Sequence, residues 1–206
     1  MNKEERHKIK RAAYHEAGHI VFSLSCGVIP DRAAVSWTGE GFTTLPEGAF
    51  SSIENIAMCL IGLMAQIKGL IDPSKKDLYS DIKRLNEKKS FLDGHDVEDL
   101  AIMTGKQKIN SNDIDTITEI CRLDDWLAGK WDDVNKLARA LQLRGILGQS
   151  DYKLFDIMPC RYNTWLEEKT GQSEMEILND VIKSIKGKMP NPKKMWEDLK
   201  KVRSKY

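Results

Sequence analysis

Two histidines and a glutamate near the start of the chain have the spacing of a catalytic metal site. Residues 14–19 read YHEAGH, so His15, Glu16 and His19 occupy the fixed positions of the pattern H-E-x-x-H. In a helix, a separation of four residues puts both imidazoles on one face, where they can reach one ion at roughly 2.0–2.1 Å each. Glu16 lies one step round the helix and can act as general base toward a water molecule that the ion activates. Because two of only four histidines fall here, the pattern predicts a zinc-dependent hydrolytic site.

A helix and a small hairpin are predicted around these residues. Apolar residues recur at helical spacing over residues 3–26, and a glycine and a proline then end the helix. Residues 33–37 and 42–45 are short β-prone runs joined by a glycine-containing turn, which is typical of a hairpin. Ser51 or Ser52 can cap the next helix, which is apolar enough to be central and buried.

The rest of the chain is predicted to be mostly helical. A break near Gly129 divides the long helical region 114–145, and the stretch 161–171 is expected to be irregular. Further helices are predicted over residues 76–90, 96–103, 174–186 and 193–205. The expected fold class is therefore α+β and mainly α-helical, with a small β-hairpin or sheet.

Four segments of the chain follow the motifs of one protease family. Residues 12–19 (AAYHEAGH), 41–48 (GFTTLPEG) and 61–66 (IGLMAQ) resemble the A-x-x-HEAGH helix, the G-x-T-x-x-L-P-E-G strand and the Gly-Gly-Arg-x-Ala-Glu helix of the FtsH-type ATP-dependent zinc proteases. Residues 131–147 are similar to the closing helix of small standalone relatives. The resemblance covers roughly residues 9–150 and implies a zincin-like peptidase domain that binds Zn²⁺.

The chain also departs from that family's pattern. The strand motif is one residue shorter, and the third motif loses the charged groups that surround the site in the family. The ATPase module and membrane anchor of the large proteases have no counterpart in this sequence. We therefore expect a standalone peptidase rather than an ATP-dependent one, with a specificity of its own.

The resemblance implies that an aspartate at the start of a later helix is the third metal ligand. Asp96 is the first candidate because it follows a glycine, opens a short predicted helix and lies at a suitable distance from the closing helix. Asp81 and Asp113 match the local letters of the family, but Asp81 lacks the preceding glycine and Asp113 lies too close to the closing helix. His95, beside Asp96, is expected to be a solvated turn residue rather than a ligand.

The overall charge of the chain indicates no particular class of partner, but its distribution is uneven. Thirty-two Lys and Arg residues against 31 Asp and Glu residues give a net charge of +1, which does not indicate a nucleic-acid or membrane-surface binder. The basic residues gather in the C-terminal segment 183–206, where apolar residues are interleaved with them. This segment is a candidate for binding an acidic partner, a nucleic acid or another subunit, or it is a solvated tail.

Cysteine usage and the N-terminus indicate a cytoplasmic protein. The first eleven residues are charged and no apolar signal core follows them, and the longest apolar run, 56–64, is too short to span a bilayer. The four cysteines, of which Cys160 is the last, are far apart and form no C-x-x-C pair. Cys26, Cys59 and Cys121 lie in apolar helical stretches, which is typical of buried thiols in a reducing compartment.

Together these patterns predict a peptidase domain over residues 1–150 and a helical extension with a basic tail over residues 151–206. The expected function is zinc-dependent hydrolysis of peptide bonds in unfolded or flexible protein segments, with Glu16 as the base and His15, His19 and Asp96 as ligands. The alternative is a non-catalytic or narrowly specific regulatory protein that uses the zinc site structurally. In that case residues 151–206 would bind the partner. The oligomeric state is not indicated by the sequence.

Overall fold

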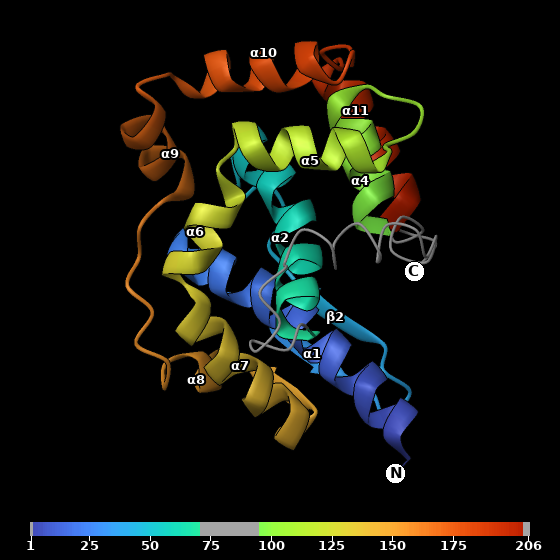
Figure 1. Ribbon diagram of the computed structural model, residues 1–206, viewed down its shortest axis with the longest axis vertical. Coiled ribbons are helices and arrows are strands. Elements are labelled where there is room, and N and C mark those ends of the chain that lie inside the picture. The colour runs from blue at the N-terminus through green and yellow to red at the C-terminus, as the bar shows by residue number, and fades with distance from the viewer. Residues whose placement is uncertain (1, 71–94, 204–206) are drawn as a thin grey trace.

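The computed structural model describes residues 2–70 and 95–203 and has the predicted α+β character, being mainly helical with a small antiparallel sheet (Figure 1). The described elements are α1 (Lys3–Ser25), β1 (Arg32–Val35), β2 (Gly41–Thr44), α2 (Ser52–Leu70), α4 (His95–Thr104), α5 (Ser111–Ile120), α6 (Leu123–Gly129), α7 (Trp131–Arg144), β3 (Ile146–Gly148), α8 (Gln149–Tyr152), α9 (Tyr162–Thr170), α10 (Glu174–Ser184) and α11 (Pro192–Arg203). The predicted helix over residues 76–90 lies outside the described residues.

Helices α1 and α2 cross at the centre of the molecule (Figure 1). The two helices approach closely at Gly18, where an added Cβ would lie 2.8 Å from the Cβ of Ala65 and 2.9 Å from the carbonyl oxygen of Ile61. Such short distances leave no room for a side chain at this crossing, so the sequence Ala17-Gly18 allows the two backbones to touch. The H-E-x-x-H segment lies at the same crossing.

A capping box starts α2 as predicted, with Ser51 at the N-cap. The Ser51 amide donates to Glu54 Oε2 at 2.9 Å, and the Glu54 amide donates to Ser51 Oγ at 3.4 Å. Among the described helices, α2 alone has the length and apolar composition of a membrane span, but 67% of its apolar window is buried inside the molecule. The apolar run 56–64 that is visible in the sequence is therefore only the middle part of this helix, which continues to Leu70.

The sheet has the strand order β2-β1-β3, with both pairings antiparallel. The hairpin β1-β2 confirms the sequence prediction, with Ala33 opposite Thr43 in the register. Strand β3 was not predicted, because three residues are too few to show an alternating pattern and Gly145 precedes them in a left-handed conformation with φ 75°. Strand β2 is thus an edge strand of this sheet.

Two helix predictions need correction. The region 114–145 breaks twice rather than once, because Arg122 takes a left-handed conformation with φ 48° between α5 and α6. The stretch 161–171, expected to be irregular, contains helix α9, whose Tyr162 and Leu166 are fully buried one turn apart. Gly171, with φ 71°, ends this helix rather than belonging to a loop.

The C-terminal part of the chain shares one core with the N-terminal part. From α8 it runs along one side of the molecule to α9 and α10 and returns as α11 beside α4 (Figure 1). Tyr162 packs against Phe22 of α1 and Trp126 of α6, with ring centroids 5.1 and 6.2 Å away. Arg161 forms an ion pair with Glu54 at the start of α2. The core therefore crosses the predicted boundary at residue 150.

Candidate metal centre

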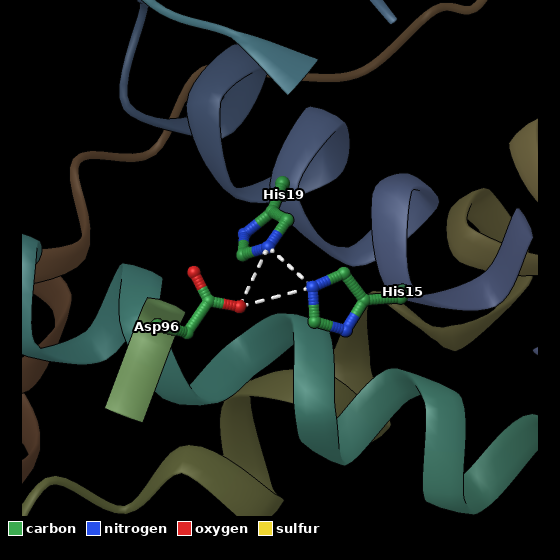
Figure 2. A group of neighbouring side chains, drawn as sticks. All are labelled: His15, His19 and Asp96. Atoms are coloured by element: carbon green, nitrogen blue, oxygen red, sulfur yellow. Dashed lines mark hydrogen bonds and ion pairs between the residues drawn. The ribbon is translucent and has the colours of Figure 1, made fainter. Parts of the chain in front are cut away.

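The two histidines of the H-E-x-x-H pattern point to one place. His15 and His19 stand one turn apart on α1, and their rings meet edge to face with centroids 4.7 Å apart (Figure 2). Their Nε2 atoms lie 3.0 Å from each other. The side chain of His19 is 9% exposed and that of His15 is 19% exposed, so both imidazoles are largely shielded from water.

Asp96, in the first turn of α4, completes a cluster of three potential ligands (Figure 2). Its Oδ2 atom lies 3.0 Å from Nε2 of His15 and 3.5 Å from Nε2 of His19. Tetrahedral coordination at metal–ligand distances of roughly 2.0–2.1 Å separates the ligand atoms by about 3.3 Å. The three distances between ligand atoms therefore match a tetrahedral site that has three protein ligands and one open position.

The charges of the cluster support one another. Burial favours the neutral imidazole, but the hydrogen bond and negative charge of Asp96, followed by the charge of Glu16, raise the pKa of His15. Burial likewise disfavours the ionised carboxyl, yet the two adjoining histidines hold the pKa of Asp96 well below its usual range. An anionic carboxylate beside two imidazoles is a donor set that suits a divalent transition metal such as zinc.

The Nδ1 atoms of the two imidazoles, which point away from the cluster, have few hydrogen-bond acceptors. With both Nε2 atoms turned toward the cluster, a bound metal requires the proton to be on Nδ1 in each ring. Nδ1 of His19 lies 3.3 Å from the sulfur of Met58, a weak acceptor, and Nδ1 of His15 is buried without a hydrogen-bond partner among the described residues. Met58 therefore orients His19 through α2.

Gly62 forms the wall of the cluster on α2. An added Cβ at this position would lie 2.5 Å from Nε2 and 2.7 Å from Cε1 of His19, and 3.0 Å from Cε1 of His15. These distances are shorter than real Cβ contacts, so any larger residue here would push the imidazoles out of place. The absence of a side chain at Gly62 leaves the space in which the three ligand atoms meet.

Glu16 is held between α1 and the edge strand β2. Its carboxylate is buried and accepts a hydrogen bond from Oγ1 of Thr43 at 2.7 Å. An added Cβ on Gly41 would lie 2.6 Å from Glu16 Oε1, so the strand passes directly over this carboxylate. Glu16 therefore has a fixed position beside the histidines and next to the strand.

The other candidate ligands have different fates. Asp113 is buried but caps α5, where it accepts from the Asn110 amide at 2.9 Å and pairs with Lys106. The structure does not bring it to the histidines. Asp81 lies outside the described residues. His95 is the first residue of α4, and its side chain is also outside what the structure describes.

Sequence reasoning did not single out three residues that shape the site. Thr43 and Gly62 fall inside the two motifs noted above, so their position within those motifs was an available signal. Met58 carries no such signal, because only the packing of α2 against α1 brings its sulfur to His19. Comparison of the chain with protein-family models, with curated proteins and with solved structures finds no match.

Proposed function

We propose that this protein is a zinc-dependent peptidase with a zincin-like site on α1. The observation that carries the proposal is the convergence of His15, His19 and Asp96 at tetrahedral spacing with Glu16 fixed beside them. A zinc ion held there would polarise a peptide carbonyl and acidify a water molecule. The resemblance of the helix and strand motifs to FtsH-type peptidases favours peptide bonds as the target.

Glu16 is proposed as the proton carrier. It accepts the proton of the attacking water and later passes it to the departing amine. The hydrogen bond from Thr43 holds the carboxylate in one orientation, so one oxygen is engaged and the other is left to take the proton. Thr43 is thus proposed as a positioning residue for the base.

The edge strand β2 is proposed as the binding site for an extended substrate. The described strands pair with only one side of β2, and Thr43 in this strand contacts Glu16 directly. A peptide added along the open edge would lie beside the proposed base, in the manner of β-strand addition. Such binding requires unfolded or flexible segments, because a folded substrate cannot supply an isolated strand.

The proposal is tested by measuring bound metal and cleavage together. Zinc content by elemental analysis is expected near one ion per chain in the wild type and to be lost in His19→Ala and Asp96→Ala. Glu16→Gln is expected to keep the metal and to lose cleavage of an unstructured protein such as casein by roughly 10²–10⁴-fold.

Two variants serve as controls. Glu98→Gln changes an exposed glutamate two residues from Asp96, and Asp115→Asn changes an exposed aspartate on α5. Both should retain metal and cleavage. A wild-type protein that takes up no zinc on reconstitution, or a Glu16→Gln variant that cleaves casein at the wild-type rate, would refute the proposal.

A regulatory protein with a structural metal is the second candidate. The ligands come from α1 and α4, so an ion would cross-link two helices that are far apart in the sequence. In this case chelation should lower the unfolding temperature and the metal-loaded protein should cleave no peptide. We propose a cytoplasmic location for either function, because three of the four cysteines are buried as free thiols, which is common in a reducing compartment: Cys26, Cys59 and Cys121.

A further inference from the structure

The helix that carries Asp96 is attached at its other end to the C-terminal part of the chain. Helix α4 ends at Thr104, whose carbonyl oxygen accepts a hydrogen bond from the Lys188 amide at 3.1 Å. Thr104 is fully buried, so this carbonyl cannot be satisfied by water instead. The bond joins the end of α4 to the segment 186–188, which follows α10, and we call this contact the α4 junction.

Two glycines allow the backbones to meet at the α4 junction. An added Cβ on Gly105 would lie closer than 3.0 Å to the Lys188 carbonyl oxygen, and one on Gly187 would lie closer than 3.0 Å to the Thr104 carbonyl oxygen. Real Cβ atoms do not make such contacts, so a side chain at either position would push the two backbones apart toward the ordinary 3.4–4 Å. No flexible side chain lies between them to absorb the change.

Left-handed residues turn the chain on both sides of the α4 junction. Gly105 has φ 62° and follows the last turn of α4, where the Lys106 amide donates to the Ala101 carbonyl oxygen at 2.9 Å. Lys186 has φ 55°, a conformation that disfavours residues other than glycine, and it turns the chain away from the end of α10. The two turns therefore fix where the end of α4 meets the segment 186–188.

Helix α4 transmits this position to the metal centre. Asp96 lies near its other end, facing His15 and His19 (Figure 2). Thr104 follows Asp96 by eight residues, which is about 12 Å along a helix axis. The helix contains neither glycine nor proline, so it has no residue at which it would readily kink. Because ligand distances in a metal site tolerate only about 0.2 Å, a shift at Thr104 matters at Asp96.

We propose that Gly105 and Gly187 are positioning residues for the metal centre, because the α4 junction holds Asp96 at ligand distance from the two histidines. The inference rests on the metal centre of the proposed function, but not on peptide cleavage. The segment after α10 is accordingly required for tight metal binding, although it contributes no ligand.

The first test measures the zinc affinity of full-length variants by competition with a chromophoric chelator. Gly187→Ala should lower the affinity at least about tenfold, within the range of about 10–100-fold that outer parts of metal sites contribute. Gly148→Ala is the matched control, because nothing lies within 4 Å of a Cβ placed there and its φ of −120° suits any residue.

A second pair of variants separates contact from backbone strain. Gly105 and Gly171 both follow helices in the left-handed conformation, with φ 62° and 71°, but nothing lies within 4 Å of a Cβ on Gly171. Both alanine variants carry the strain, and only Gly105→Ala disturbs the α4 junction. Gly105→Ala should therefore lower zinc affinity at least about tenfold more than Gly171→Ala does.

Linkage gives a test that needs no substitution at the α4 junction. If the junction favours zinc binding, zinc must favour the closed junction, so hydrogen exchange of the Lys188 amide should slow at least about fivefold with zinc. The Gly171 amide, which donates at 2.8 Å to the Glu167 carbonyl oxygen, should be unaffected. Asp96→Ala should abolish the slowing at Lys188. A junction that is merely structural would not respond to zinc.

The outcomes distinguish this inference from the peptidase proposal. Equal zinc affinity in Gly187→Ala and Gly148→Ala, or equal slowing of exchange at the Lys188 and Gly171 amides, would overturn the inference alone. Junction-dependent zinc affinity without cleavage of casein would support it and refute the peptidase. A wild type that takes up no zinc would overturn both. Circular dichroism verifies folding, and if Gly187→Ala does not fold, the exchange measurement on the wild type decides.

Discussion

Two carboxylates of this protein, those of Glu54 and Asp96, have contrasting surroundings. Glu54 has a fully buried side chain, and both of its oxygens are engaged, by Arg161 at 3.1 and 2.9 Å and by the Ser51 amide at 2.9 Å. Asp96 instead faces two imidazoles, and their Nε2 atoms converge with its Oδ2. In this cluster the Nδ1 atom of His15 is buried and has no hydrogen-bond partner in the described part of the chain.

The difference separates a structural polar group from a binding one. At Glu54, cation, carboxylate and helix cap satisfy one another within the protein, so no further partner is needed. At Asp96, two imidazole nitrogens and a carboxylate oxygen meet at a single point, which is the donor set that a divalent cation would take. Each of the following predictions tests whether the two regions respond independently.

The largest effect is expected for Gly62→Ala. The added methyl would occupy the space next to Nε2 of His19, so zinc affinity should fall by about 100-fold or more, the upper end of what outer partners of a metal site contribute. Competition with a chromophoric chelator measures the affinity. Gly129→Ala is the matched control, because nothing lies within 4 Å of a Cβ placed there. Equal zinc affinity in both variants would contradict the geometry of the site.

Arg161→Ala should act on stability and leave zinc affinity unchanged. It leaves the Glu54 carboxylate buried without its cation, which is expected to lower the free energy of unfolding by roughly 2–3 kcal/mol, less than for a fully buried pair because Arg161 is half exposed. Urea unfolding gives the value. Arg122→Ala, which breaks the exposed pair with Asp125, should change it by about 1 kcal/mol or less. A similar loss in both variants would show that burial of Glu54 is unimportant.

Because of the ion pair between Arg161 and Glu54, we expect the free energy of unfolding to fall in acid. Burial opposes ionisation of Glu54, but hydrogen bonds from Arg161 and Ser51 outweigh it and hold its pKa below the ordinary value of 4.5. The stabilisation is complete above that value and disappears as the pH falls from it through the lowered folded pKa. Urea unfolding of metal-free protein between pH 6 and 3 should therefore show a steeper loss in the wild type than in Glu54→Gln. Parallel curves would rule out this linkage.

The smallest effect is expected for Met58→Leu. This change keeps the volume and removes the sulfur that accepts from Nδ1 of His19, so zinc affinity should fall by about 2–5-fold, in keeping with a weak hydrogen bond. Met64→Leu, on the same helix, removes a longer sulfur contact with Thr118 and should leave affinity unaltered. If Met58→Leu binds zinc like the wild type, Met58 does not orient the ligand.

The residues of the candidate site that could be predicted from the sequence are those whose spacing lies within one helix or one motif. His15, Glu16 and His19 follow from spacing within one helix, and the family resemblance ranked Asp96 first among three aspartates. Met58 meets His19 only because α1 and α2 cross, and no sequence pattern encodes that meeting. Helix boundaries show the same limit. Arg122 breaks a helix by adopting a left-handed conformation that its residue type does not favour.

The order of the elements has a consequence for folding. Residues 3–70 form α1, β1, β2 and α2 in succession, so the histidine pair and its Gly62 wall arise from neighbouring parts of the chain, whereas Asp96 arrives from beyond them. Closing the shorter loops costs less entropy. We expect the two histidines to assemble first and the aspartate to join later, giving a transient site of two ligands that binds zinc weakly before it binds tightly. Stopped-flow refolding with a zinc indicator should therefore resolve two phases of metal uptake, and a single phase would refute this order.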